Sequence, residues 1–410
     1  MRKSARPATI LLWLALAAPA AAQTGGDDWT RCASHAPATS IAGCTAVIES
    51  RGTAPVRLAV AFHSRGVAYF KSGLVDRAVA DLDRAVELNP RYAEAFNDRG
   101  IAYGVQRLYD RAIQDFDRAI RLDPNYSDAF VNRGLAYDKM GSTDRAIREF
   151  DRAIALNPTN SIAYLDRGNA YVKENRDDLA LQDYDRAISL NPNSSKPFDN
   201  RGNVYERKGL YDRAILDYDR AIELNPAEPN AYVNRGVAHA KKGLNDRAMQ
   251  DFDRAIALDP KFVPAYLNRG TTFDQQGRYD QAMSDYDRAI ALEPTSAGAY
   301  NNRCWTHVML KQATEALVDC DRSLALRPND AATLDSRGFA SLRANQAPDA
   351  VRDFSAALAI DPKQASSRYG LGLAKRLTGD TAGGDADIAA ATLLKPGIAA
   401  DFARYGFTPR

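Results

Sequence analysis

Apolar residues recur at helical spacing in two short stretches of each 34-residue segment of the chain. In residues 127–160 the first stretch carries Phe130, Gly134 and Tyr137, and the second carries Ala146, Phe150, Ala153 and Leu156. Spacings of three and four positions place such side chains on one face of an α-helix. Gly141 stands between the stretches and Pro158 follows the second, and both residue types interrupt helices. Each segment is therefore predicted to form two amphipathic helices joined by a tight turn.

The same pattern returns at one fixed interval along the chain. The Arg-Gly dipeptide begins at Arg65, Arg99, Arg133, Arg167, Arg201, Arg235, Arg269 and Arg337, and Arg303 is followed by Cys304 instead. Proline keeps the same interval at Pro90, Pro124, Pro158, Pro192, Pro226, Pro260, Pro294, Pro328, Pro362 and Pro396. Repeats of this length are typical of solenoids, in which each repeat buries its apolar face against its neighbours. The sequence predicts an all-α solenoid of helical hairpins.

The recurrent glycine lies in the middle of the first predicted helix, where it costs about 1 kcal/mol relative to alanine. An alanine follows it at a constant separation, as in Gly100 with Ala112 and Gly134 with Ala146. We expect these two small residues to face each other and to let the two helices approach closely.

The order of aromatic and small residues within each repeat resembles that of the tetratricopeptide repeat family. In the second repeat it reads Phe96, Gly100, Tyr103, Ala112, Phe116, Ala119 and Pro124. This resemblance implies a right-handed superhelix, with nine repeats in residues 59–364 and a degenerate tenth repeat and C-terminal cap in residues 365–410. Residues 23–58 are expected to form a degenerate N-terminal hairpin with a pair of cysteines. The chain departs from the family in having Arg before the glycine, where Leu is usual.

The segment 1–22 has the form of a secretory signal peptide. Three basic residues precede an apolar run that is shorter than the roughly 20 residues of a membrane span. Cleavage after Ala22 would leave 54 − 3 = 51 basic residues against 52 acidic ones, a net charge of −1. Such a surface offers no long-range attraction for nucleic acid or anionic lipid. The signal and the Arg- and Ala-rich composition favour an exported bacterial protein without a membrane span. The periplasm is the expected location, and secretion and an uncleaved anchor are the alternatives.

The four cysteines replace residues of the repeat pattern. Cys304 takes the place of the glycine and Cys320 that of the second-helix aromatic, two positions that the family pattern sets against each other. Cys32 and Cys44 stand one repeat length before Gly66 and its following alanine. An even number of cysteines in an exported chain favours disulfides over metal binding. We expect the disulfides Cys32–Cys44 and Cys304–Cys320; four buried thiols are the alternative.

Paired carboxylates recur in the motif Asp-x-Asp-Arg, as at Asp115 and Asp117. A catalytic pair has no reason to return in every repeat, and the motif lacks the ligand spacing of an EF-hand. We expect instead that the Arg before each glycine, such as Arg133, forms an ion pair with an Asp of a neighbouring helix. His239 and His307 take a recurrent tyrosine position and are expected in the core. The sequence offers no catalytic residues, metal ligands or cofactor motif, and predicts that the chain is not an enzyme.

Asparagine recurs two positions before the glycine. These residues are Asn132, Asn200, Asn234, Asn268 and Asn302. By the resemblance, this row faces the concave groove, where an amide side chain can both donate to and accept from the backbone of an extended peptide. Alternatively, each Asn bonds only to residues of neighbouring repeats. Trp305 lies on the same side, either as a binding platform or, as we favour, as a packing residue.

These observations predict a protein–protein interaction scaffold or adaptor of the cell envelope, which binds an extended segment of a protein or peptide partner in its concave groove. Two alternatives use other surfaces. The array would either assemble with itself or with an export machine through its outer face, or it would serve as a regulatory adaptor of an envelope hydrolase.

Overall fold

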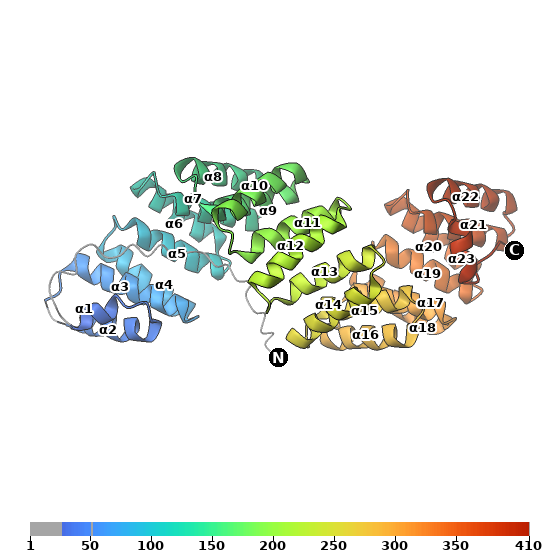
Figure 1. Ribbon diagram of the computed structural model, residues 1–410, viewed down its shortest axis with the longest axis horizontal. Helices are drawn as coiled ribbons and strands as arrows, with labels where there is room; N and C mark the ends of the chain where they lie inside the picture. Colours follow the sequence, from blue (N-terminus) through green and yellow to red (C-terminus); the bar gives the residue numbers. More distant parts are fainter. Residues whose placement is uncertain (1–26, 51, 410) are drawn as a thin grey trace. The chain divides into compact units, whose positions relative to one another are not determined.

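The computed structural model describes residues 27–50 and 52–409 (Figure 1). The expected signal peptide lies outside these residues. They contain 23 α-helices and no strand, so this part of the chain has the predicted all-α solenoid fold. None of the helices described is long and apolar enough to cross a membrane.

The helices gather into two compact halves whose boundary falls within α11 (Ser195–Arg207). The N-terminal half contains α1 (Asp27–Cys32), α2 (Pro37–Glu49), α3 (Pro55–Lys71), α4 (Val75–Leu88), α5 (Ala93–Val105), α6 (Tyr109–Leu122), α7 (Ser127–Lys139), α8 (Thr143–Leu156), α9 (Ser161–Lys173) and α10 (Asp177–Leu190). The C-terminal half contains α12 (Tyr211–Leu224), α13 (Pro229–Lys241), α14 (Asn245–Leu258), α15 (Val263–Gln275), α16 (Tyr279–Leu292), α17 (Ala297–Met309), α18 (Ala313–Leu326), α19 (Ala331–Arg343), α20 (Ala347–Ile360), α21 (Ala365–Leu377), α22 (Thr381–Leu394) and α23 (Ile398–Arg404).

Each repeat is a hairpin of a first, odd-numbered helix and a second, even-numbered helix. The turn between them holds one residue in the left-handed region, such as Gly141 with φ of 77° between α7 and α8. Glycine adopts this conformation without the steric penalty of a Cβ atom. The second helix ends before Asn157, whose non-helical backbone leads into Pro158. The turn and the proline thus separate successive helices where the sequence predicts.

The recurrent glycine faces an aromatic ring. A Cβ atom added to Gly134 would lie 2.7 Å from Cε1 of Phe150, sixteen positions further along the chain. The nearest side chain to Gly134 is thus the ring sixteen positions on. The missing Cβ lets the first helix lie directly on this buried ring. The expected approach of the residue twelve positions on is seen at Gly66, where a Cβ atom would lie 3.2 Å from the carbonyl oxygen of Ala78.

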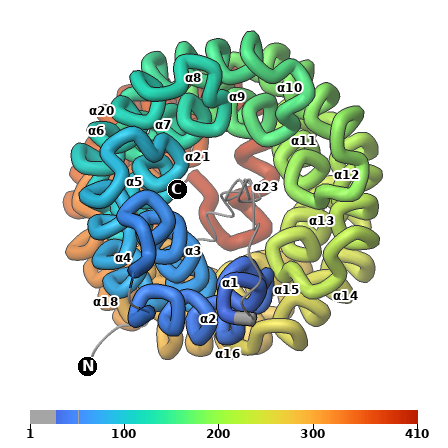
Figure 2. Tube along the Cα trace, turned by 90° about the vertical axis from the view of Figure 1, so that its left-hand side faces the viewer, coloured from blue at the N-terminus to red at the C-terminus, as the bar shows by residue number. Residues whose placement is uncertain are grey.

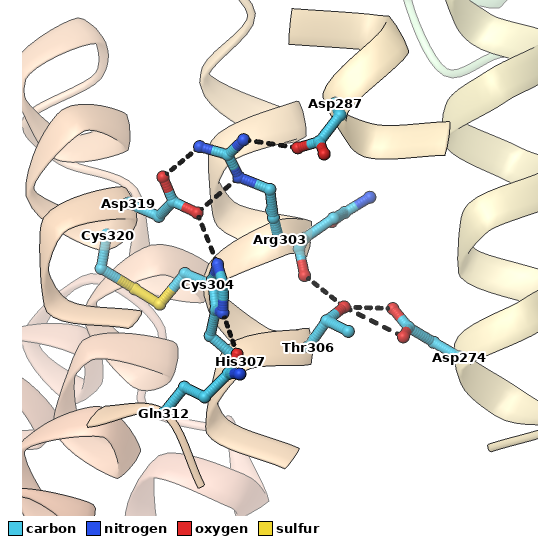
Figure 3. Close-up of polar contacts among 10 residues, drawn as sticks. Asp274, Asp287, Arg303, Cys304, Thr306, His307, Gln312, Asp319 and Cys320 are labelled. Atoms are coloured by element: carbon cyan, nitrogen blue, oxygen red, sulfur yellow. Dashed lines mark hydrogen bonds and ion pairs between the residues drawn. A yellow bond between two sulfur atoms is a disulfide. The ribbon is translucent and has the colours of Figure 1, made fainter. Parts of the chain in front are cut away.

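Both predicted disulfides are present in the structure. Cys304 and Cys320 are 16 residues apart and join α17 to α18 (Figure 3). This is the separation of the glycine and the ring in the other repeats, so the disulfide replaces a packing contact with a covalent bond. Cys32 and Cys44 join α1 to α2 in the N-terminal hairpin. All four cysteines are buried.

The Arg before each glycine joins three helices, an arrangement that we call the arginine clamp. Arg269 on α15 donates through Nε and Nη2 to the carboxylate of Asp285 on α16, at 2.8 and 2.6 Å. Its Nη1 donates to Asp253 on α14 of the preceding repeat at 2.5 Å. The guanidinium carbon also lies 5.7 Å from the ring centroid of Tyr266. The predicted pairing of arginine with an acidic residue of a neighbouring helix is confirmed.

The clamp recurs with acceptors sixteen positions before and after the arginine. It is formed by Arg99, Arg133, Arg167, Arg235, Arg303 and Arg337 as well. The two carboxylates of each Asp-x-Asp motif are therefore divided between the arginine of their own repeat and that of the next. Glu149 replaces the first Asp in the clamp of Arg133.

The two helices of a repeat differ in their neighbours. Within the described residues, first helices of successive repeats contact one another, whereas second helices contact only first helices and α23. The first helices are thus closer together and line the inner, concave side of each half. In the C-terminal half, α23 contacts α21 and lies inside the curve of the first helices (Figure 2).

Replacing Arg269 by Ala should lower the free energy of unfolding by about 3 kcal/mol, because it leaves a buried carboxylate without its partner. The side chain of Asp285 is only 6% exposed, whereas that of Asp253 is 60% exposed. The Asp253→Ala variant should therefore lose less than about 1 kcal/mol. Urea unfolding followed by circular dichroism measures both. Equal losses would contradict the view that the buried carboxylate anchors the clamp.

Reduction of Cys304–Cys320 should destabilise the C-terminal half by about 3 kcal/mol, because the bond closes a short loop in the unfolded chain. The double variant Cys304→Gly, Cys320→Phe restores the glycine–ring pair and should make this half insensitive to dithiothreitol. Urea unfolding with and without reductant, followed by Trp305 fluorescence in a Trp13→Phe, Trp29→Phe background, measures the difference. A transition of the double variant that still shifts with reductant would show that the effect arises elsewhere.

Candidate functional site

A cavity of about 370 Å³ opens on the inner side of the C-terminal half. It lies along the first helices α15, α17, α19 and α21 and is bounded by α23. Its lining consists of Thr271, Asp274, Gln275, Tyr279, Asn301, Asn302, Trp305, Met309, Ala332, Asp335, Ser336, Gln364, Ser366, Phe402 and Tyr405. The cavity combines an aromatic side with two carboxylates and several amides and hydroxyls.

Trp305 and two residues of the C-terminal segment form the aromatic side. The Trp305 ring lies 6.5 Å from the ring of Phe402 and 6.1 Å from that of Tyr405, in both cases edge to face. It also packs against Phe339 at 5.7 Å. The packing role favoured from the sequence is therefore present, and the same side chain lines the cavity.

The helix α23 is fixed in place by contacts from first helices. The ring of Phe402 stacks on Phe339 with centroids 4.7 Å apart. Arg343 donates to the carbonyl oxygen of Tyr405, and its guanidinium carbon lies 4.0 Å from the ring centroid of Phe407. Because these residues come from α19 and from the end of the chain, the aromatic side forms only when the C-terminus folds back.

Asp274, near the end of α15, is held by two hydroxyl groups. Tyr286 donates to it at 2.7 Å. Thr306 on α17 donates at 2.9 Å (Figure 3). Burial raises the pKa of Asp274 to about 6, although both hydrogen bonds oppose this shift. The carboxylate thus remains largely ionised near neutral pH with hydroxyl partners alone.

Asp335 on α19 has a similar environment. Ser367 on α21 donates to its carboxylate at 2.5 Å. Burial raises the pKa of Asp335 to about 6, against the opposing effect of hydrogen bonds from Ser367 and Ser366. No lysine, arginine or histidine belongs to the cavity lining.

Two further acceptors of the lining have no partner. Asn301 Oδ1 and Gln364 Oε1 are buried, and neither has a hydrogen-bond donor among the described residues. A buried acceptor without a partner costs about 1–3 kcal/mol. The cavity is therefore rich in acceptors, and such a site favours a ligand that brings hydrogen-bond donors.

Family comparisons agree with the repeat geometry. Models described as tetratricopeptide repeat match residues 63–127, 131–195, 229–262 and 263–296, and one described as TPR repeat matches residues 202–243. Together these matches cover more than half of the chain. The protein belongs to the tetratricopeptide repeat family. Members of this family typically act as protein–protein interaction scaffolds and are generally non-catalytic.

The chain is similar to several solved structures, and one of them shows the same fold. A tetratricopeptide repeat protein from Parabacteroides merdae is 21% identical, with a TM-score of 0.52, over 62% of this chain and 98% of that one. MamA is 28% identical with a TM-score of 0.37, over 40% of this chain and 95% of that one. YrrB, described as a TPR protein with an unusual peptide-binding site, is 25% identical with a TM-score of 0.37, over 45% and 95%. No curated protein matches the sequence significantly.

In this tetratricopeptide repeat array, the asparagine row has two environments. Asn132 is buried and donates to Asn97 of the preceding repeat at 2.9 Å. Asn200 donates in the same way to Asn169 at 2.7 Å. These two amides contribute to contacts between repeats, as in the alternative that the sequence left open.

The asparagines of the row in the C-terminal half differ in exposure and in hydrogen-bond partner. Asn268 is partly exposed and donates to the carbonyl oxygen of Pro264, one turn back in its own helix. Asn302 donates to Thr271 at a long 3.4 Å and lines the cavity. Asn234 is also partly exposed. Of the five predicted residues, Asn302 alone belongs to the cavity lining, which the structure builds mainly from other residues.

Sequence reasoning missed Asp274, Asp335, Asn301 and Gln364. A signal was present three positions before the glycine, where Val131 and Val233 are apolar but Asn301 and Asp335 are polar. Both valines are buried. The same row also holds His63, Asn97 and Asp199, so polarity at this position does not by itself mark the cavity.

The predicted histidines lie beside the clamps. His239 is buried and lies 3.0 Å from the carboxylate of Asp251. His307 is mostly buried, 3.6 Å from Asp319 and hydrogen-bonded to Gln312 (Figure 3). The described residues contain no group of three or more His, Cys, Asp or Glu side chains placed to hold a metal ion.

The Asp335→Asn variant should gain stability over the parent as the pH rises. Because the pKa of Asp335 is raised to about 6 in the folded protein, the folded state holds its proton more tightly than the unfolded state. Its contribution is most favourable below the unfolded pKa, about 3.9, and falls as the pH rises through the folded value. The difference in unfolding free energy should grow by about 2 kcal/mol between about pH 4 and pH 7.

Urea unfolding at a series of pH values measures this difference. The pH dependence of the unfolding free energy that arises from Asp274 is common to both proteins, so it cancels in the difference. A constant difference across the pH range would contradict a buried, ionised Asp335.

Proposed function

We propose that the protein is an adaptor of the cell envelope that binds an extended segment of a partner protein along the inner side of its first helices. The observation that carries the proposal is the cavity of the C-terminal half, whose lining combines two carboxylates, amides and aromatic rings around a volume of about 370 Å³. Such a site suits a side chain or a short peptide segment better than a folded surface.

The energetics favour a peptide held by one of its side chains over a peptide held only by hydrogen bonds to its backbone. A hydrogen bond from an amide such as Asn268 contributes about 0.5–1.5 kcal/mol net. Fixing one peptide residue costs about 1–2 kcal/mol, so backbone contacts roughly offset the ordering of the segment. Net affinity must come from a side chain that enters a desolvated pocket, and the cavity beside Asn302 provides one.

The two disulfides support an oxidising compartment as the location of the protein. Each cross-links one hairpin and is buried. Such bonds form and persist in oxidising compartments and are rare in the cytosol. Together with the signal-like segment 1–22, they support an exported and periplasmic location.

A crosslinked pull-down from envelope extract tests the proposal. The parent is compared with a variant that carries Asn234→Ala, Asn268→Ala and Asn302→Ala, after circular dichroism has shown equal helicity. We expect the parent to capture a partner and the variant to retain less than about one tenth of it, because partly exposed amides and one edge of the cavity are lost together.

The matched control alters the second helices. Leu216 and Val318 are 69% and 64% exposed on α12 and α18, and their replacement by Ala should leave capture unchanged. Loss of the partner with the control and not with the asparagine variant would instead indicate binding through the outer face.

A further inference from the structure

We propose that the cavity of the C-terminal half binds an arginine side chain of the partner segment. The proposal rests on the function proposed above and specifies the chemistry that the segment must carry. It follows from three independent properties of the cavity: its charge, its surplus of acceptors and its aromatic side.

The charge of the cavity is not compensated by the chain. Asp274 and Asp335 accept hydrogen bonds from hydroxyl groups only, and no basic residue contributes to the lining. The carboxylates of the arginine clamps, by contrast, each face a guanidinium at hydrogen-bond distance. Among the described residues, neither Asp274 nor Asp335 has such a cation at hydrogen-bond distance. A buried carboxylate without a cation is costly, and a cationic ligand would remove that cost.

The acceptors of the cavity match the donors of a guanidinium group. Asn301 Oδ1 and Gln364 Oε1 add two buried, unpartnered acceptors to the two carboxylates. A guanidinium carries five N–H donors in one plane and no acceptor, whereas an ammonium carries three donors at one point. Acceptors that are spread over several helices are served better by the wider, planar donor set.

The aromatic side provides a surface for the same group. Trp305, Phe402 and Tyr405 bound the cavity, and guanidinium groups stack favourably on such rings. The chain itself contains this contact nearby, where Arg343 lies 4.0 Å from the Phe407 ring centroid. An arginine that enters the cavity would thus find ring surface on one side and acceptors on the other.

A series of capped, extended Gly/Ser peptides with one variable central residue tests the proposal on the full chain. Binding is followed by Trp305 fluorescence in a Trp13→Phe, Trp29→Phe background and by isothermal titration. The arginine peptide should bind about tenfold or more tightly than its glutamine counterpart, with the lysine peptide in between. Equal binding of the arginine and glutamine peptides would overturn the proposal.

Variants locate the site. In the double variant Asp274→Asn, Asp335→Asn the preference for arginine over glutamine should fall below about twofold. The control variant Glu223→Gln, Asp349→Asn removes two carboxylates from second helices and should keep the full preference. Should the first variant keep the preference, the arginine site lies elsewhere and the proposal fails. Comparing peptides on the unaltered protein gives an answer even if a variant folds poorly.

Two further measurements distinguish the arginine site from a site for small cations and from the adaptor function as a whole. Ethylguanidinium alone should bind at least about tenfold more weakly than the arginine peptide, since it lacks backbone contacts. Equal binding of the two would identify a small cation as the ligand and overturn the proposal. A partner captured through the inner face, with no arginine preference in the peptide series, would refute the arginine site and leave the adaptor function intact.

Discussion

The architecture depends on the arginine clamp. Each guanidinium binds one carboxylate of its own hairpin and one of the preceding hairpin, so a single side chain fixes both the pairing of two helices and their docking on a third. The pair within the hairpin is buried and bidentate, a geometry that limits the orientation of the helices more strictly than apolar contact does. Recurring through the array, the clamp gives successive repeats the same spacing. At the N-terminal end, Arg65 keeps its own aspartate and uses Thr45 of α2 in place of the second one.

The glycine–ring contact and the disulfide are two solutions to the same packing problem. In most repeats the absent Cβ admits a large ring between the helices. In the hairpin of α17 and α18 two sulfur atoms occupy this space. The helix so fixed presents Asn301, Asn302 and Trp305 on its inner side, and its Thr306 holds Asp274 of the preceding repeat. The covalent bond therefore stiffens the helix that contributes most to the cavity.

The buried acids of the clamps differ from those of the cavity in their partners. Those of the Asp-x-Asp motif face arginine and stabilise the fold. Asp274 and Asp335 are also buried, but their partners are hydroxyl groups in place of a guanidinium, and burial raises their pKa values to about 6. The two acids of the cavity reduce the stability of the free protein, which is a common property of binding sites.

The sequence by itself determined the repeat length, the helical hairpins, the cysteine pairs and the partners of the arginines, because each depends on contacts at short and fixed separations. It did not determine which residue faces the glycine, since alanine and ring lie four positions apart on the same helical face and only packing distinguishes them. Nor did it reveal the cavity. Asp274, Asp335, Gln364 and Tyr405 lie far apart along the chain, and they come together only through the curvature of the first helices and the return of α23 to their inner side. Tertiary structure also gave the asparagines different environments. Asn132 is buried and donates a hydrogen bond to Asn97, whereas Asn302 lines the cavity.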